Sequence, residues 1–285
     1  MTNPRMIIFG GSGFIGRWVS QLANIAGWDV TSLGSAAIDL TKEIDSSLIS
    51  KIVRNGDVVV HAAAIAPTRS VDDLSRNLVM TKNLAAALSP LTGLDVVLIS
   101  SDAVYGSSSG VVNEDSPCNP DSLHGVMSLG RELVTAEMHP SSLTILRPVP
   151  VYGVDDTHNS YGPNKMAREA VSSGRISIFG AGSATRDHVS VQDVARIVVD
   201  AASRRGGGVF NIASGQSFSF SKVADLIASS SSNKVRLEHV GEEAMPTFRT
   251  MDISLMLRSF PNHSPTSLEF GIEALVHDLE NLNGN

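Results

Sequence analysis

The sequence predicts an α/β fold in which helices cover both faces of a doubly wound parallel sheet, followed by a small C-terminal α/β lobe. Short apolar runs alternate with helix-length segments through the first half of the chain. A glycine-rich turn, FGGSGFIG, joins the first run directly to the first helical segment. After Pro148 the alternation loosens, which indicates a separate lobe. Ligands of open parallel sheets bind beyond the carboxyl ends of the strands, so the informative residues should follow each strand.

Five strands and three helices are expected before the loosening. The first strand is short and ends in glycine, and the helix after it carries Val19, Leu22, Ala23 and Ala26 at helical spacing. The third strand, VVVH, is apolar enough to be buried on both faces. The expected strands are residues 6–9, 29–33, 58–61, 96–100 and 143–148, and the expected helices are residues 17–26, 72–88 and 129–138.

The second half is expected to hold further helices and one strand. Pro163 suits the first position of a helix, where its missing N–H removes no hydrogen bond. The closing stretch SPTSLEFGIEALVHDLE gives a capped amphipathic helix from about Ser267. The serine run at 229–233 is expected to be a solvated connection. The remaining expected elements are helices at 163–172, 189–202 and 220–228 and a strand at 207–212.

Composition and charge exclude several classes of protein. The length of 285 residues, with 42% hydrophobic and 18% charged residues, suits one α/β domain with a small lobe. A net charge of −7 argues against nucleic acid or an anionic membrane as the main partner. Cys118 is the only cysteine, which excludes an internal disulfide and a thiolate-rich metal site. No apolar run reaches the roughly 18 residues of a membrane helix. The N-terminal apolar run is too short for a signal peptide, so a cytoplasmic protein is expected.

The glycine-rich turn predicts a phosphate-binding loop. Gly10, Gly13 and Gly16 are spaced three apart between a strand and a helix. Glycine lets the backbone turn sharply and approach a pyrophosphate, whose charge then faces the helix N-terminus. The alternative is a merely tight turn, but the strand–turn–helix setting favours nucleotide binding.

Four further motifs follow in a fixed order: HAAA at 61–64, ISSDAVYG at 99–106, LRPVPVYG at 146–153 and RDHVSVQDVA at 186–195. With the glycine loop, this order resembles the extended short-chain dehydrogenases/reductases of the nucleotide-sugar epimerase/dehydratase type, over essentially the whole chain. The resemblance implies a Rossmann domain that binds a nicotinamide dinucleotide and a lobe that closes over a nucleoside-diphosphate sugar. The implied Rossmann domain comprises residues 1–152 and about 188–213, and the implied lobe about 153–187 and 214–285.

The resemblance also implies which residues contact the dinucleotide. The glycine loop would line the pyrophosphate, residues in IDLTKE would lie near the adenine, and three strand ends would surround the nicotinamide. Pro150 stands where the family usually carries an asparagine in RPxNVYG. The implied contacts are Gly10, Gly13, Phe14, Ile15 and Gly16 for the pyrophosphate, Asp39 and Leu40 for the adenine, Ala62, Ala63, Ala64 and Ser100 for the nicotinamide, and Pro148 and Val151 for its carboxamide.

The end of the second strand bears on the choice between NAD and NADP. Gly34 occupies the position at which NAD-preferring relatives carry an acidic residue. Without a carboxylate there, nothing repels a 2′-phosphate, and Ser35 and Arg17 can contact one. This favours NADP; the alternative is that the loop is simply shorter and accepts either cofactor.

The catalytic motif departs from the family pattern. In the family a Ser or Thr at a strand end acts with a Tyr and a Lys, four residues apart on the next helix. Ser101 matches the hydroxyl, and Asp102 occupies a position used as an acid in some dehydratases. HGVMSLGRE aligns with YGxSKxxxE, so His124 takes the tyrosine position and Ser128 the lysine position.

Two interpretations of this departure remain open. An imidazole titrates near pH 6.5 and can exchange a proton without a lysine to tune it. His124 would then be the acid/base of a modified epimerase, dehydratase or ketoreductase. Ser128, however, is too short to reach the cofactor ribose as a lysine does. The alternative is therefore a protein that binds NAD(P) or a sugar nucleotide without turnover, as a sensor or an assembly subunit.

Three residues are expected to contact the substrate. Arg186 matches a family contact to the sugar-nucleotide phosphates, and a guanidinium grips phosphate oxygens in pairs. Its alternative role is an internal ion pair with Asp187 or Asp193. Tyr161 and Lys165, in SYGPNK, have the spacing of a catalytic pair but follow the wrong strand, so we expect them in the substrate pocket.

The other polar residues carry fewer expectations. His61 is expected to shape the cofactor cleft, and no histidines show metal-ligand spacing, so no metal site is expected. Asp155 and Asp156 are expected to lie solvated in a loop. Relatives often form homodimers through two helices, which here would include residues 72–88 and 129–138.

Overall fold

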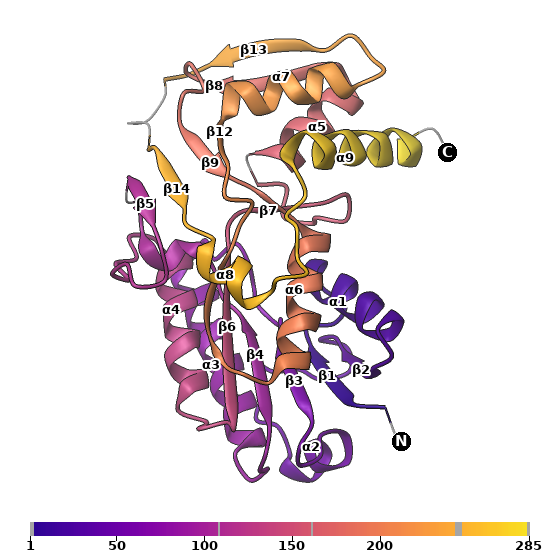
Figure 1. The fold of residues 1–285 in the computed structure, drawn as a ribbon, viewed down its shortest axis with the longest axis vertical. Helices are drawn as coiled ribbons and strands as arrows, with labels where there is room; N and C mark the ends of the chain where they lie inside the picture. The colour runs from indigo at the N-terminus through magenta and orange to yellow at the C-terminus, as the bar shows by residue number, and fades with distance from the viewer. Residues whose placement is uncertain (1–2, 108, 161, 243–246, 284–285) are drawn as a thin grey trace.

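A computed structural model of the protein describes residues 3–107, 109–160, 162–242 and 247–283, and its core is a parallel sheet (Figure 1). The order of the strands in the described sheet is β11-β6-β4-β3-β1-β2. This confirms the expected doubly wound α/β fold. The strands are β1 (Arg5–Phe9), β2 (Asp29–Leu33), β3 (Val58–His61), β4 (Asp95–Ile99), β6 (Ser142–Pro148) and β11 (Gly208–Ile212).

The strand order reverses beside β1, which lies between β2 and β3. Met6 pairs with Val30 on one side and with Val58 on the other. Such a reversal opens a crevice at the carboxyl ends of the two diverging strands. The glycine loop follows β1 and the HAAA motif follows β3, so both motifs lie at this crevice.

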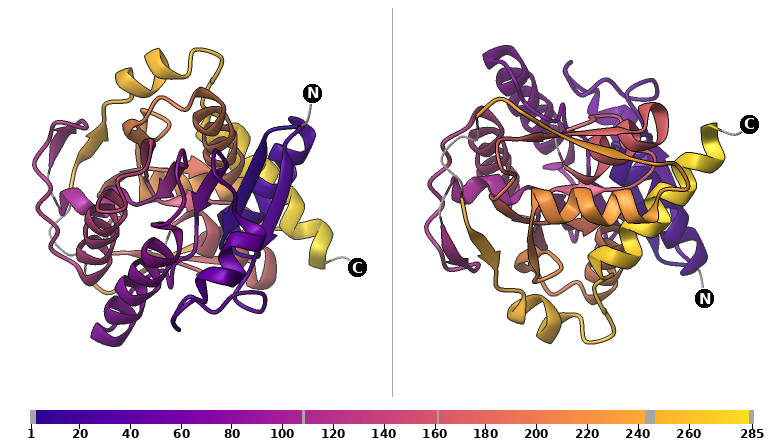
Figure 2. Two further views of the ribbon diagram at one scale, coloured as in Figure 1. Left: turned by 90° about the horizontal axis from the view of Figure 1, so that it is seen from below. Right: turned by 90° about the horizontal axis from the view of Figure 1, so that it is seen from above.

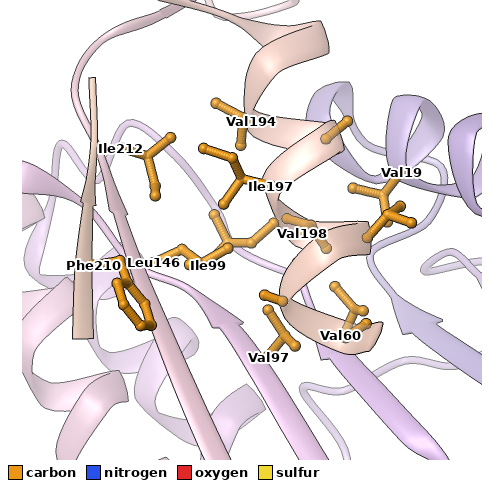
Figure 3. Close-up of a cluster of buried hydrophobic side chains, with 14 of the residues drawn as sticks. Val19, Val60, Val97, Ile99, Leu146, Val194, Ile197, Val198, Phe210 and Ile212 are labelled. Atoms are coloured by element: carbon orange, nitrogen blue, oxygen red, sulfur yellow. The ribbon is translucent and has the colours of Figure 1, made fainter. Parts of the chain in front are cut away.

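Helices cover both faces of the sheet, as the sequence predicts. The helices α1 (Phe14–Ile25) and α6 (Val191–Arg204) pack on one face, where Val194, Ile197 and Val198 of α6 meet strand residues such as Val97 and Ile99 (Figure 3). The opposite face packs against α2 (Ser46–Ile52) and α3 (Val71–Leu88), and α4 (Leu123–Ala136) lies against α3. Because both faces are covered, the strands read as continuous apolar runs.

A second hydrophobic core forms the lobe at one end of the molecule (Figure 1). It gathers Met166, Ile176, Val223 and Ile272 from different elements. Seen from that end, α7 and α9 lie across its outer surface (Figure 2). The lobe elements are α5 (Pro163–Ser173), β8 (Arg175–Phe179), α7 (Phe220–Ser230), β13 (Arg236–Val240) and α9 (Leu268–Asn283).

Short strand pairs connect the lobe to the sheet region. They are β7 (Val151–Tyr152) with β10 (Val189–Ser190), β9 (Thr185–Asp187) with β12 (Ser217–Ser219), and β5 (Gly110–Val112) with β14 (Arg249–Met251). A 3-10 turn, η1 (Asp102–Tyr105), follows β4, and α8 (Ser254–Ser259) lies near β11. Met256 of α8 and Phe260 pack in the core of the sheet, so this part of the sequence joins the larger core rather than the lobe.

Several element ends differ from the expected ones. The helix α4 begins at Leu123, not at 129, because Ser122 caps it by accepting a hydrogen bond from the Gly125 amide at 3.1 Å. Two glycines in its first turns had hidden the helical pattern. The expected connection from 229 begins two residues later, because its first two serines end α7 and donate to backbone carbonyls one turn back. Within the described ranges, no helix is long and apolar enough to cross a membrane.

Candidate functional site

A cavity of about 550 Å³ lies between the carboxyl ends of the sheet strands and the lobe, a volume suited to a small-molecule ligand. The loops after β1, β3, β4 and β6 contribute to its wall, together with α4 and the segment that leads into α5. Twelve predicted site residues line it: Gly13, Phe14, Ile15, Gly16, Ala62, Ala64, Ser100, Ser101, Asp102, His124, Pro148 and Val151.

Glycines let the backbone of this loop pass close to neighbouring backbone, where a side chain would not fit. Gly10 has a φ of +89°, and a Cβ added there would lie 2.4 Å from the Ala63 nitrogen. A Cβ on Gly16 would lie 2.2 Å from the Gly10 carbonyl oxygen. The N-terminus of α1 has no side-chain cap at Gly13, so its amides remain available to an anion. These features fit the pyrophosphate of a dinucleotide.

The predicted adenine-side residues lie outside the cavity lining. Asp39 is exposed and accepts hydrogen bonds from the amide and hydroxyl of Thr41, at 3.1 and 2.6 Å, which lower its pKa. Arg17 donates to the Asp155 carbonyl at 3.4 Å. Ser35 is exposed and Leu40 is buried. The loop after β2 is also tight, because a Cβ on Gly34 would lie 2.4 Å from the Ser12 hydroxyl.

A buried polar network fixes α4 against the strands that carry the site. The Ser100 hydroxyl donates to Glu132 Oε1 at 2.5 Å, and Arg147 donates to both Glu132 oxygens at 3.0 and 2.7 Å. Arg147 also donates to the Tyr105 hydroxyl at 2.8 Å, which donates to Asn211 at 2.8 Å. Burial acts to lower the pKa of Arg147, but the hydrogen bonds and charge of Glu132 raise it above its ordinary value. The network therefore holds an ionised pair in the interior.

Ser101 and Asp102 follow β4, and an arginine that the sequence analysis missed holds them. The Ser101 hydroxyl accepts from the Ala103 amide at 3.1 Å and donates to Asp102 at 3.5 Å. Arg249 forms an ion pair with Asp102 and donates to the Gly106 carbonyl at 2.8 Å. Burial raises the pKa of Asp102, and the charges of Arg249 and Arg186 offset only part of that rise.

His124 and Ser128 lie on the first turns of α4, as the alignment predicts. His124 Nδ1 accepts a hydrogen bond from the Thr68 amide at 3.4 Å. Burial, and then the charges of Arg131 and His158, lower the pKa of His124. The Ser128 hydroxyl donates to the His124 carbonyl at 2.9 Å. The position of the family lysine therefore supplies no cation.

Arg131, one turn further along α4, places a positive charge in the cavity wall. Its side chain is buried, with the two terminal nitrogens donating to the carbonyls of Ile99 and Ala63, each at 3.0 Å. Within the described residues its Nε has no hydrogen-bond partner. Burial lowers the pKa of Arg131 to about 10, so the group stays charged at neutral pH. No family motif marks Arg131, so it was not among the predicted site residues.

Asp156 is buried, so the expectation that it is solvated is wrong. It is 6% exposed and accepts hydrogen bonds from the amide and Nδ1 of His158, both at 3.0 Å. Asn159 and Asn164 donate to its other oxygen at 3.1 and 2.9 Å. Burial acts to raise the pKa of Asp156, but the hydrogen bonds from His158 lower it below its ordinary value. Asp156 and His158 line the cavity together, and nothing in their sequence spacing indicated this.

The three predicted substrate contacts have separate outcomes. Tyr161 lies outside the described residues. Lys165 pairs with Glu169 at 3.6 Å and lies outside the cavity lining. Arg186 has an Nη1 that is buried without a hydrogen-bond partner among the described residues. Its alternative partners are engaged elsewhere.

The engagement of those two aspartates is direct. Asp187 accepts from the Ser214 hydroxyl at 2.7 Å, and Asp193 pairs with Arg196 at 2.7 Å. His61, expected to shape the cleft, is buried and lies 3.1 Å from the Thr81 hydroxyl. Burial and the charge of Arg131 hold the pKa of His61 well below its usual value.

The chain is similar to proteins of one family in sequence and in structure. A profile described as the NAD dependent epimerase/dehydratase family matches residues 6–213. The UDP-glucose 4-epimerase of Mycolicibacterium smegmatis is 31% identical over 256 residues, covering 79% of this chain and 82% of that protein.

Two solved structures share the fold. UDP-glucuronic acid 4-epimerase from Bacillus cereus, in complex with NAD, has a TM-score of 0.81 and 24% identity, covering 98% of this chain and 99% of that one. RMD from Pseudomonas aeruginosa, complexed with NADPH, has a TM-score of 0.84 and 21% identity, covering 99% of each chain.

Proposed function

Because this chain belongs to the NAD dependent epimerase/dehydratase family, we propose that it is an enzyme that uses a nicotinamide dinucleotide to transform a nucleoside-diphosphate sugar. The observation that carries the proposal is the cavity, which the glycine-rich loop bounds on one side and the lobe on the other. An epimerase, a dehydratase and a ketoreductase all use such a site. The relatives named above support the substrate class, since two act on UDP-sugars by name.

Within this site, Ser101 and His124 contact the reacting oxygen of the sugar. Both line the cavity and both belong to family motifs: Ser101 follows β4, and His124 lies on α4. Asp102 is committed to Arg249, so it positions Ser101 rather than donating a proton itself. Arg131 supplies the positive charge that Ser128 does not, because its guanidinium lies in the same wall of the cavity.

Arg186 holds the substrate phosphates from the lobe side. Its unpartnered Nη1 is a donor for which no described residue provides an acceptor, and a phosphate oxygen would satisfy it. Tyr161 and Lys165, which precede Arg186 in the chain, remain the other two proposed substrate contacts; Lys165 would have to leave Glu169 to reach the substrate. An Arg186→Leu variant should raise the KM for UDP-sugars at least tenfold while leaving dinucleotide affinity unchanged.

NADP is the favoured cofactor. The Gly34 position has no carboxylate to repel a 2′-phosphate, and Ser35 is exposed beside it. Arg17 holds only a 3.4 Å hydrogen bond to a backbone carbonyl, so its guanidinium can turn to a phosphate. Titration of the protein with NADPH and with NADH, followed by nicotinamide fluorescence, should give tighter binding of NADPH.

The second candidate function is binding without turnover, and the Ser128 geometry favours it. Its hydroxyl is turned to its own helix, so the cofactor ribose loses the contact that lysine provides in the family. The deciding experiment is product analysis by chromatography after incubation with NADP or NAD and either UDP-glucose or UDP-glucuronic acid. Turnover that collapses in His124→Ala supports the enzyme. Dinucleotide binding without any product supports the binding protein.

A homodimer completes the proposal. The helices α3 and α4 pack side by side, and each exposes apolar side chains, including Val79, Val126 and Leu133. An apolar face on two adjacent helices suits a two-fold interface. Light scattering after size-exclusion chromatography should give twice the chain mass.

A further inference from the structure

Two histidines line the same cavity from different elements. His124 comes from α4, and His158 comes from the segment between β7 and α5. Nδ1 of each ring already has a hydrogen-bond partner. The partner of His124 is a backbone N–H group, which donates, and the partner of His158 is a carboxylate, which accepts. Since the hydrogen bond at one ring nitrogen decides which nitrogen carries the proton, the two rings differ in tautomer.

The partner of His124 fixes its proton on Nε2. A backbone amide can only donate, so the hydrogen bond from Thr68 requires an unprotonated Nδ1. A charged ring would place a second N–H against that amide and lose the bond. Burial and the neighbouring charge of Arg131 also disfavour the charged ring. His124 is therefore a neutral ring that can donate from Nε2, while its one lone pair, on Nδ1, already accepts from the Thr68 amide.

The partner of His158 fixes the opposite arrangement. Among the described residues, Asp156 accepts four hydrogen bonds and lies 3.7 Å from the Arg168 guanidinium. A carboxylate so surrounded is ionised and only accepts, so His158 Nδ1 must donate to it. The lone pair of the neutral ring is then on Nε2. Protonation of that nitrogen keeps the bond to Asp156 and adds charge attraction to it.

We propose that His158, held by Asp156, is the proton-accepting base of this site, and that His124 is a neutral hydrogen-bond donor to the same substrate oxygen. The assignment rests on the proposed function. With an oxidised nicotinamide dinucleotide bound as hydride acceptor, the hydroxyl proton of the sugar would pass to His158 Nε2 while the hydrogen on the same carbon left with its electron pair as a hydride, and a carbonyl would remain. His124 and Ser101 then donate to the carbonyl oxygen. In the reverse direction the charged His158 returns the proton.

The charged groups around the two rings differ in sign. His124 faces Arg131 and His158, and both disfavour a positive ring. His158 faces Asp156, which favours one, and the nearby Arg168 is itself paired with that carboxylate. A proton accepted at His158 is therefore held beside a carboxylate, whereas one at His124 would lie near the charge of Arg131. This division explains how the site works without a tyrosine and lysine, because the proton and the hydrogen bond are assigned to separate rings.

The tautomers can be measured without ligand, by nitrogen NMR of the full chain labelled with ¹⁵N-histidine. His124→Gln and His158→Gln each assign one ring by the loss of its signals. We expect an unprotonated Nδ1 and a protonated Nε2 for His124, and the reverse for His158 at a pH where it is neutral. The Asp156→Ala variant, which leaves Nδ1 without a side-chain acceptor, should abolish the preference of His158. A proton on His158 Nε2 in the neutral wild-type ring, or on His124 Nδ1, would overturn the assignment.

Kinetics form a second arm, with NADP or NAD and UDP-glucose or UDP-glucuronic acid as probes. In His158→Gln, kcat should fall at least about 100-fold, as for loss of a general base, with dinucleotide affinity unchanged. The exposed His277→Gln variant is the matched control and should keep full activity. Full activity in His158→Gln would refute the proposal. If wild-type protein turns over neither substrate, the proposed function fails for them, and the NMR result still decides the tautomers.

Discussion

The buried pair of Glu132 and Arg147 gives a stability prediction that the structure makes quantitative. The perturbation is Glu132→Gln, which keeps the size of the side chain and removes its charge. Glu132 and Arg147 are 4% and 6% exposed, so solvent cannot replace the lost partner. Three donors, the Ser100 hydroxyl and two Arg147 nitrogens, share the two carboxylate oxygens. A glutamine has only one acceptor oxygen, and its NH₂ must face at least one of these donors.

Removing one member of a buried ion pair costs about 3–5 kcal/mol, because the other charge is left uncompensated in the interior. For a chain of this size, about 2–4 °C of melting temperature corresponds to 1 kcal/mol. The melting temperature of Glu132→Gln is therefore expected to be about 6–20 °C below that of the wild type. Tyr105→Phe removes only one acceptor of Arg147 and should cost less, about 1–3 kcal/mol.

Differential scanning calorimetry or circular dichroism measures both changes. Arg236→Gln is the control, since Arg236 and Glu238 form an exposed pair that solvent screens. Its melting temperature should match that of the wild type. If Glu132→Gln and Arg236→Gln have the same melting temperature, the interior pair contributes nothing to stability, and the reasoning about the network is refuted.

Three further predictions concern the cofactor, pH and assembly. Gly34→Asp should weaken NADP binding at least about tenfold relative to NAD, because the carboxylate repels the 2′-phosphate; equal losses for both in fluorescence titrations would contradict this. Burial, and then the charge of Arg186, lower the pKa of His188 to about 4 in the folded protein. As the pH falls below about 6.5, this histidine is therefore protonated in the unfolded chain but stays neutral in the folded one. The contribution of His188 to the free energy of unfolding is fully present above about pH 6.5. It decreases as the pH falls, by about 2 kcal/mol between pH 7 and pH 5. Burial raises the pKa of Asp187 to about 6, which acts in the opposite direction, so the effect of His188 must be read as the difference between wild type and His188→Gln in urea titrations at the two pH values. An identical pH dependence in the two proteins would refute it. Leu133→Asp should convert the proposed dimer to a monomer in light scattering, whereas an unchanged mass would place the interface elsewhere.

Much of the fold follows from local sequence patterns. The strands are short apolar runs bounded by turn residues, and burial on both faces makes them easy to locate. The glycine loop was also predictable, because its chemistry depends on residues that are adjacent in the sequence. The start of α4 was missed, since its glycines interrupt the helical pattern that Ser122 nonetheless caps.

The polar part of the site depends on contacts that no local pattern records. Asp102 pairs with Arg249, 147 residues further along the chain. Asp156 lies in a loop whose sequence predicts solvent exposure. Its burial depends on its hydrogen bond with Asn164 and its position in the cavity wall. From the sequence, Arg131 is indistinguishable from a surface residue of a helix. In the folded protein it is buried and donates to two backbone carbonyls at or just after the ends of strands. Such pairings depend on the tertiary structure, so sequence alone could not assign them.

The central claim is that backbone groups of the glycine loop bind a dinucleotide, and isothermal titration calorimetry with NADP and with NAD tests it most directly. Gly16→Val is the test variant, because a side chain there would overlap the Gly10 carbonyl. Gly206→Ala is the control, since a Cβ there would lie 3.9 Å from the Arg204 carbonyl oxygen. We predict saturable heat from one site per chain for wild type and Gly206→Ala, and none for Gly16→Val. No heat from the wild-type protein with either dinucleotide, or equal heat from Gly16→Val, would contradict the account.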